Sequence, residues 1–182
     1  LGAPAREVTE DCSPHGSTTV AFWEPALTDV KGENGAKQRR TAVAETADIL
    51  ANLVSSRVRT IAFIKSRRGA ESIASITKRL LDEVDPSLPG RVAAYRSGYL
   101  PEERRALEQA LRSGQLLGVS STSALELGID ISGLDAVLVA GWPGTRASLF
   151  QPIGRAGRAG QDAIAAFVAS DDPLGTYLVN HP

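Results

Sequence analysis

The segment "TIAFIKSRRGAESIASITKRLLDEVDP", Thr60 to Pro86, places a short apolar run directly before a helical pattern. The run "TIAFI" lacks polar alternation, which is typical of a strand buried on both faces. From about Arg68, apolar residues recur at helical spacing and stop before Pro86. A buried strand followed by a helix is the unit from which parallel sheets are built.

The same alternation continues along the chain. Apolar runs "RVAAY", "LLGVSS", "DAVLVA" and "AIAAFVAS" predict further buried strands. Helices are expected from Arg40 to about Val54, over "LPEERRALEQALRSG", around Ser123 to Leu127, and after "WPGT". This pattern predicts the α/β class, a doubly wound parallel sheet with helices on both faces.

The first 39 residues differ from the rest. They contain one alternating stretch, Thr18 to Trp23, and a polar, glycine-rich segment "DVKGENGAK". We therefore divide the chain into residues 1–39, a linker with one strand and an exposed loop, and residues 40–182, the α/β domain.

Composition excludes several classes of protein. The 182 residues suffice for one domain, 42% are apolar, and no run approaches the roughly 18 apolar residues of a membrane span. We expect a cytoplasmic, nucleoid-associated bacterial protein with no membrane partner. The net charge is −1, so any contact with nucleic acid must be local. One cysteine, Cys12, excludes an internal disulfide. The chain has no methionine, and we expect a piece of a longer polypeptide.

Two arginines in "SLFQPIGRAGRAGQD" form a candidate phosphate site. Arg155 and Arg158 are three residues apart, so on a helix both guanidinium groups lie on one side. Planar guanidinium groups suit phosphate oxygens, and the neighbouring glycines allow another backbone to approach. The alternative interpretation is a solvated basic face with flexible glycines.

A phosphate-binding loop is missing from the sequence. No G-x-x-x-x-G-K-[ST] pattern occurs, and "GENGAK" lacks both its spacing and its hydroxyl. The acidic pair Asp82 and Glu83 ends a helix pattern, which favours a helix terminus over a magnesium site. The chain alone therefore cannot both hold and cleave a nucleoside triphosphate.

Polar residues also follow four predicted strands, at the sheet edge where ligands of such folds collect. Among them are Arg96 and Ser97 after "RVAAY", and Trp142 to Thr145 after "DAVLVA". "IKSRRGAE" places Lys65, Ser66 and Arg67 at a helix start, where an anion binds favourably. "STSALELGIDI" offers the hydroxyls of Thr122 and Ser123. Taken singly, the first segment is more often a solvated helix start, and an N-cap followed by a short helix explains the second equally well.

In this order the segments resemble the second RecA-like domain of superfamily 2 helicases. "TIAFIKSRRGAE" is similar to motif IV, "STSALELGIDI" to motif V and "QPIGRAGR" to motif VI. The resemblance covers about Thr60 to Ser170. Within the superfamily, "AGWPGTRASLFQ" and the segment from Tyr99 to Ile131 resemble DNA-repair helicases of the MrfA type, including the SftH group.

The resemblance implies a role for each candidate residue. Arg155 and Arg158 would reach the γ-phosphate of ATP, one as an arginine finger, with Gln151 aligning the motif. Gly128 and Asp130 would lie at the nucleotide. Lys65, Ser66, Arg67, Thr122 and Ser123 would contact the backbone of single-stranded or tailed DNA. ATP and Mg²⁺ would be bound mainly by the first RecA-like domain of the same polypeptide, which this chain lacks.

The main hypothesis is therefore a second motor domain of an ATP-dependent DNA helicase, inactive by itself. The alternatives are a RecA-like lobe that only binds nucleic acid or protein, and a translocase that does not separate strands. Proline lacks an amide hydrogen and would clash with the Ser148 carbonyl inside a helix. We expect a break or a helix start at Pro152.

Overall fold

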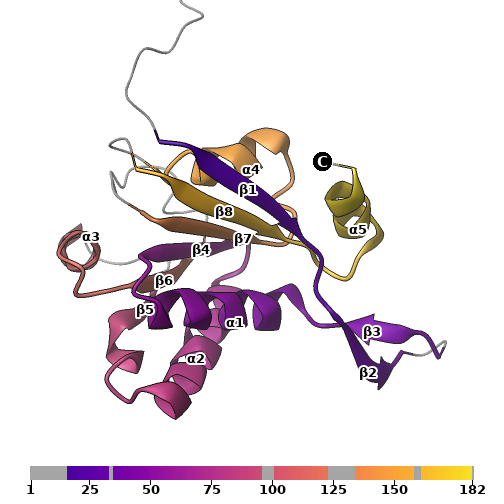
Figure 1. The fold of residues 1–182 in the computed structure, drawn as a ribbon, viewed down its shortest axis with the longest axis horizontal. Coiled ribbons are helices and arrows are strands. Elements are labelled where there is room, and N and C mark those ends of the chain that lie inside the picture. Colours follow the sequence, from indigo (N-terminus) through magenta and orange to yellow (C-terminus); the bar gives the residue numbers. More distant parts are fainter. Residues whose placement is uncertain (1–15, 33–34, 96–100, 123–133, 158–160, 182) are drawn as a thin grey trace, which may run out of the picture.

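Six parallel strands form the central sheet in the computed structural model, which describes residues 16–32, 35–95, 101–122, 134–157 and 161–181 (Figure 1). Their spatial order is β1-β8-β7-β4-β6-β5. The strands are β1 (Thr18–Trp23), β4 (Thr60–Ile64), β5 (Val92–Tyr95), β6 (Gly118–Ser121), β7 (Ala136–Ala140) and β8 (Ala163–Val168). The four apolar runs and "TIAFI" are all strands, which confirms the predicted sheet.

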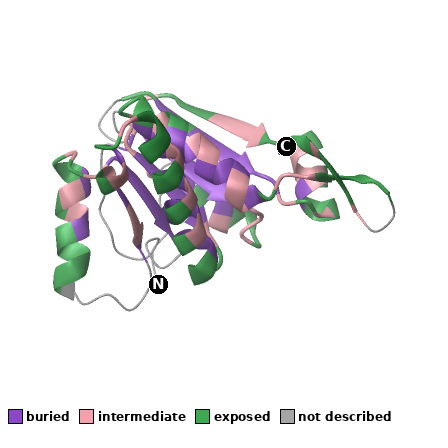
Figure 2. Ribbon diagram, turned by 90° about the horizontal axis from the view of Figure 1, so that it is seen from below, coloured by how far each residue is buried: buried purple, intermediate pink, exposed green. Residues whose placement is uncertain are grey.

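Helices cover both faces of this sheet. On one face lie α1 (Ala42–Ser55) and α2 (Arg67–Val84), followed by the short 3₁₀ turn η1 (Pro89–Arg91). On the other lie α3 (Pro101–Arg112), α4 (Arg146–Ile153) and α5 (Pro173–Asn180). β4, β6 and β7 are buried almost throughout, because apolar side chains pack on both sides of each (Figure 2). The doubly wound α/β class is thus confirmed.

A small antiparallel hairpin replaces the exposed loop that the sequence predicted. β2 (Leu27–Lys31) pairs with β3 (Lys37–Arg39) and projects from the domain (Figure 1). The Thr28 hydroxyl donates to the Gln38 carbonyl, and Lys37 pairs with Asp29. Both strands are mostly exposed, so they carry no apolar alternation from which a strand could be predicted.

Ion pairs brace the base of this hairpin. Arg39 pairs with Glu24 at 2.9 Å, and its backbone N–H donates to Asp171. Arg40 pairs with Glu45 and Asp48 at the start of α1, and the hydrogen bond to Asp48 raises the pKa of Arg40. β1, which precedes the expected boundary at residue 39, forms the edge of the main sheet beside β8.

Because the six strands are parallel, their C-terminal ends all lie on one side of the sheet, the right-hand side of Figure 1. We call this row of strand ends the carboxyl edge, and the row of strand starts the amino edge. Helices that follow a strand begin at the carboxyl edge, where their N-terminal N–H groups and dipoles favour anions. Three such starts carry a side-chain cap: Ser66 on α2, Thr145 on α4 and Asp172 on α5.

Candidate functional site

The first cluster of candidate residues lies at the carboxyl edge, where β4 ends. Lys65, Ser66 and Arg67 are exposed there. The Ser66 hydroxyl accepts the N–H of Gly69 at 3.0 Å and so caps α2. A Cβ on Gly69 would lie 2.6 Å from the end of the Ile64 side chain and 2.8 Å from that hydroxyl, so a larger residue would require these side chains to shift. The predicted anion site therefore combines the positive end of the α2 dipole, the Ser66 hydroxyl, and the cations Lys65 and Arg67.

A groove of about 580 Å³ runs along this edge beside the cluster. Lys65 and Ser66 line it together with Trp142, which follows β7. Asp171 and Asp172 lie on its walls as well, but both carboxylates are engaged. Asp171 accepts the Arg39 N–H, and Asp172 accepts the Gly175 N–H at 2.7 Å. The groove thus has both cationic and acidic walls.

Thr122 follows β6, the strand next to β4, so the structure brings it to the same edge. Its side chain is only 5% exposed, unlike those of Lys65 and Arg67. The Thr122 hydroxyl finds no hydrogen-bond partner among the described residues. Ser123, Gly128, Asp130 and Arg158, also predicted as site residues, lie outside the described part of the chain.

The second cluster lies at the amino edge, at the far end of α4. The Gly157 N–H donates to the Leu134 carbonyl, and Ala156 forms a parallel bridge with Leu134, just before β7. Gly157 has φ +74°, and a Cβ there would lie 2.8 Å from the Gln161 carbonyl. This tight turn holds Arg155, whose side chain is half-buried, at the amino end of the sheet.

The two clusters are therefore at opposite edges of the same sheet. β7 has five residues, each of which rises about 3.3 Å, so the edges lie about 16 Å apart. Gln151 lies four residues before Arg155, exposed on α4. The structure thus places Gln151 and Arg155 toward the amino edge, and Lys65, Ser66, Arg67 and Thr122 at the carboxyl edge.

The prediction of a break or helix start at Pro152 is wrong. α4 begins at Arg146, where the Thr145 hydroxyl accepts the Ser148 N–H at 3.0 Å, and Pro152 is its second-last residue. Proline has no N–H to donate to the Ser148 carbonyl, and the helix ends one residue later. There the N–H groups of Arg155 and Ala156 bond carbonyls three residues earlier, which tightens the chain into the turn.

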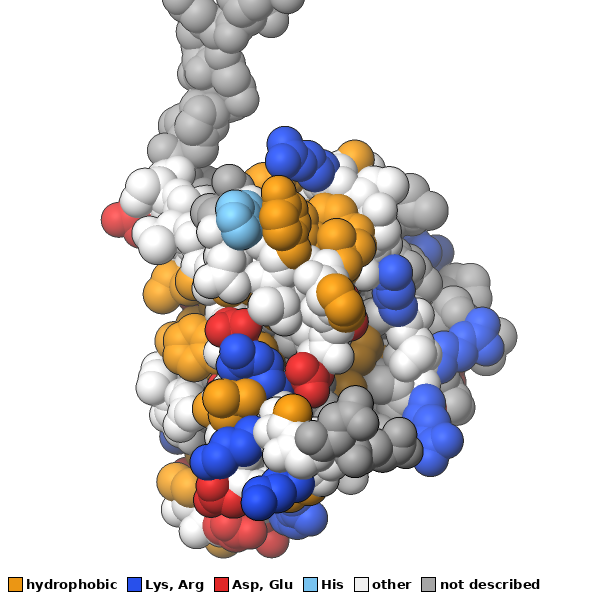
Figure 3. All heavy atoms as spheres, turned by 90° about the vertical axis from the view of Figure 1, so that its right-hand side faces the viewer, with side chains coloured by type: hydrophobic (Ala, Val, Ile, Leu, Met, Phe, Trp, Pro, Cys, Tyr) orange, Lys and Arg blue, Asp and Glu red, His pale blue; other side chains and the backbone are white. Residues whose placement is uncertain are grey.

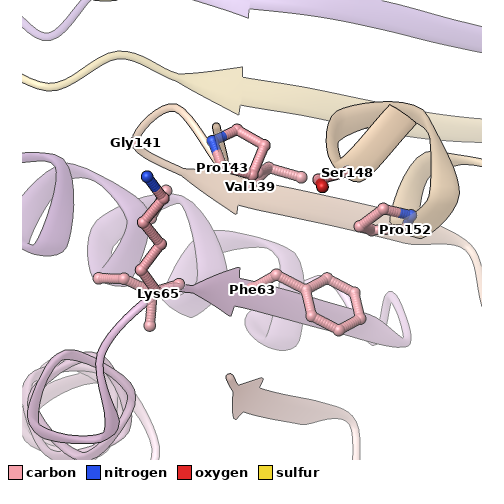
Figure 4. Close-up of a pocket in the computed structure, with 9 residues that line it drawn as sticks. Phe63, Lys65, Val139, Gly141, Pro143, Ser148 and Pro152 are labelled. Atoms are coloured by element: carbon pink, nitrogen blue, oxygen red, sulfur yellow. The ribbon is translucent and has the colours of Figure 1, made fainter. Parts of the chain in front are cut away.

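A small cavity of about 130 Å³ separates α4 from the ends of β4 and β7 (Figure 4). Pro152 and Ser148 line it from α4, and Phe63 lines it from β4. Lys65 extends across its mouth toward Pro143 (Figure 4). A Cβ on Gly144 would lie 3.9 Å from the Lys65 ammonium. The loop before α4 therefore lies beside Lys65 of the first cluster, whereas the turn after α4 forms the second.

Sequence reasoning noted Trp142 to Thr145 because they follow a predicted strand, but it missed Arg146, the next residue. Both Trp142 and Arg146 belong to "GWPGTR", before and at the predicted helix start. Position was the available signal for Arg146 as well, since this segment follows the end of β7. Among the described residues there is no group of three potential metal ligands and no helix that could cross a membrane.

Comparisons with known sequences identify relatives of the whole chain. Residues 43–160 match the helicase conserved C-terminal domain. The chain is 37% identical to the ATP-dependent helicase YprA of Bacillus subtilis and 39% identical to the ATP-dependent helicase HRQ1 of Saccharomyces cerevisiae. These alignments cover 100% and 96% of this chain, but 23% and 16% of the relatives. The chain thus spans less than a quarter of these relatives.

Solved structures show the same architecture. The DUF1998 helicase MrfA bound to DNA and AMPPNP matches with a TM-score of 0.85 and 37% identity, over 100% of this chain and 24% of MrfA. The helicase Lhr of Mycobacterium smegmatis, bound to single-stranded DNA and AMP-PNP, matches with a TM-score of 0.71 and 26% identity. That match covers 93% of this chain and 21% of Lhr.

Proposed function

The chain belongs to the helicase conserved C-terminal domain family, and from this premise we propose that it is the second motor domain of an ATP-dependent DNA helicase. The observation that carries the proposal is the placement of its two clusters. A basic, capped helix start lies at the carboxyl edge, and an arginine turn is fixed to the amino edge. One helix, α4, connects the two.

The arginine turn is proposed as half of an ATP site. Arg155 and Arg158 would neutralise charge on the transferring γ-phosphoryl group, with Gln151 aligning the turn, and Gly128 and Asp130 would lie beside the nucleotide. Guanidinium groups suit this role because they are planar and permanently charged. ATP, when bound, supplies the phosphoryl group whose transfer drives movement, and an arginine finger accelerates that transfer about a thousandfold or more.

The other half of the ATP site is assigned to the first RecA-like domain of the same polypeptide. The sequence contains no phosphate-binding loop. Its described residues offer arginine for the anion rather than a group of acidic ligands for Mg²⁺. We therefore place Mg²⁺ and most contacts to ATP on that domain. The isolated chain would be inactive.

The carboxyl edge is proposed as the DNA contact. Lys65, Ser66 and Arg67, with Thr122 and Ser123 on the neighbouring segment, would bind phosphates of single-stranded or tailed DNA. Backbone contacts of this kind carry no sequence information, which suits a motor that must move along any sequence. MrfA and Lhr are both solved with DNA, which supports this choice of ligand. The resemblance to DNA-repair helicases supports a proposed role of the full-length protein in repair.

α4 offers a physical route between DNA and ATP. Its N-terminal loop lines one cavity with Lys65, and its C-terminal turn holds Arg155. A helix of eight residues moves as a rigid body more readily than it bends. When the first RecA-like domain closes on the nucleotide and Arg155, α4 would therefore shift the loop beside the groove that contains Lys65.

The proposal is tested by ATP hydrolysis. The isolated chain should release no phosphate from ATP. In the full-length protein, Arg158→Ala should abolish DNA-stimulated hydrolysis while the circular dichroism spectrum stays unchanged. Near-normal turnover by that variant would contradict the arginine-finger assignment. A full-length wild-type protein that binds DNA without hydrolysing ATP would instead favour the alternative, a lobe that only binds.

A strand-displacement assay then separates a helicase from a translocase. A tailed duplex should lose its second strand only in the presence of ATP if the protein is a helicase. Hydrolysis stimulated by DNA without displacement would identify a translocase.

A further inference from the structure

An aromatic pocket lies next to the groove that contains Lys65 and Ser66, between β1, α4 and α5. Its volume is about 140 Å³. The apolar lining consists of Phe22, Trp142, Leu149, Phe150 and Leu178. Arg146 and His181 complete it. A cavity of about 150 Å³ with an aliphatic and aromatic lining holds a benzene ring, so this pocket has room for a planar ring.

The walls of the pocket are held in place by the core. Phe22 and Trp142 each pack edge-on against the fully buried Phe167, with ring centroids 6.1 Å apart in both pairs. Phe150 lies at the mouth of the pocket, and 51% of this apolar residue is exposed to solvent. His181, which also lines the pocket, stacks on Tyr177 at 4.4 Å. The pocket is a preformed aromatic surface that opens to solvent.

Trp142 lines both this pocket and the groove that contains Lys65 and Ser66. The two hollows therefore adjoin each other at Trp142, on the carboxyl edge. Figure 3 shows this edge face-on: hydrophobic side chains gather beside the histidine, and basic side chains extend over the same face. Exposed Arg146, on the first turn of α4, supplies a cation at the pocket itself.

We propose that this pocket holds one unstacked base of the DNA strand that leaves the groove, with Arg146 on the flanking phosphate. The inference rests on the proposed DNA-binding function. A base is favoured over a protein side chain because the pocket adjoins the groove that contains Lys65 and carries its own arginine. Aromatic side chains stack with any base, so the pocket requires no particular sequence. The acidic wall at Asp171 and Asp172 disfavours phosphates and would direct the backbone toward Arg146.

The test is an abasic scan with the full-length protein. Single-stranded oligothymidylate with one abasic site, moved stepwise along the strand, is titrated against the wild-type protein. One position should weaken binding about tenfold, since stacking of one base contributes on that order. In Phe150→Ala the intact strand should bind about tenfold more weakly, and the abasic penalty at that position should disappear. Phe150→Tyr, which keeps the ring, should keep the penalty.

Ile164→Ala is the matched control. Ile164 is also 51% exposed but lies at the start of β8, at the amino edge. This variant should keep wild-type affinity and the wild-type abasic penalty. Loss of the penalty in Ile164→Ala would show that truncation of any exposed apolar side chain perturbs binding, and would overturn the assignment.

Two further results would overturn the inference while leaving the proposed function intact. The wild-type protein could bind DNA with no position sensitive to loss of its base. Alternatively, Phe150→Ala could lower the melting temperature of the DNA-free protein and keep the abasic penalty, which would show that a protein segment fills the pocket. Failure of the wild-type protein to bind DNA at all would refute the proposed function, and this inference with it.

Discussion

The Leu134 carbonyl accepts the Gly157 N–H at 3.2 Å, and this bond fixes the arginine turn to the amino end of β7. The turn therefore moves with the sheet rather than as a free loop. Lys65 lies at the other end of the neighbouring strand. Nucleotide and DNA contacts are thus proposed at opposite edges of one rigid layer.

Gly157→Ala should damage this turn. Its φ of +74° is strained for alanine, and the added Cβ would lie 2.8 Å from the Gln161 carbonyl. We expect the free energy of unfolding of the chain to fall by about 1–2 kcal/mol, measured by urea titration. ATP turnover of the full-length variant should fall too, because Arg155 and Arg158 flank this residue.

Gly154→Ala is the control for that prediction. Gly154 has φ −65°, and the nearest atom to a Cβ there is 3.4 Å away. Stability and ATP turnover should stay close to wild type. Equal loss in both variants would show that the turn tolerates no alanine, whatever the backbone angle.

Lys65→Gln should reduce the salt dependence of DNA binding. Removal of one phosphate contact lowers the slope of log Kd against log salt concentration by about 0.7 for a single strand. The full-length variant would be titrated with single-stranded DNA at several salt concentrations. Lys78→Gln, an exposed lysine further along α2, should leave the slope unchanged. An unchanged slope in Lys65→Gln would remove Lys65 from the DNA contact.

Asp162, directly before β8, should make the stability of the folded chain depend on pH in the acidic range. Hydrogen bonds from the Ser17 hydroxyl, at 2.7 Å, and from its backbone N–H lower the pKa of Asp162 below the ordinary 3.8. Because the folded-state pKa is the lower one, the stabilisation is present above the unfolded-state pKa. It is lost as the pH falls through the folded-state value.

The comparison of wild type with Asp162→Asn tests this sign. The wild-type chain should have the higher urea midpoint at about pH 6, and the difference should shrink at about pH 3. Ser17→Ala keeps the backbone N–H that donates to Asp162. Its urea midpoint at about pH 6 should therefore lie closer to that of the wild type than the midpoint of Asp162→Asn does. A difference that grows in acid would mean that burial, and not hydrogen bonding, dominates the pKa of Asp162.

The sequence predicts the central layer well because burial on both faces leaves a clear pattern. "TIAFI" and "DAVLVA" are apolar after their first residue, and these apolar runs form central strands. The strand order depends on contacts between distant segments, such as β1 with β8, which periodicity does not record. The hairpin was missed because its strands are exposed, and α5 was missed although Asp172 followed by Pro173 is a typical helix start.

The sequence identified candidate site residues, but it did not predict how they are arranged in space. Lys65, Ser66 and Arg67 were expected together because they directly follow one strand. The position of Arg155 at the opposite edge depends on the length of α4 and on the bond to Leu134, and neither follows from spacing. The aromatic pocket joins Phe22, Trp142 and Leu178, which lie far apart in sequence.

ATP turnover by full-length Arg155→Ala at saturating DNA tests the central claim most directly. We predict a loss of about a thousandfold, with a Kd for DNA within about twofold of wild type. Arg79→Ala, an exposed arginine on α2, should hydrolyse ATP like the wild type. Wild-type turnover by Arg155→Ala would contradict the account, because the arginine turn would then not act on the nucleotide.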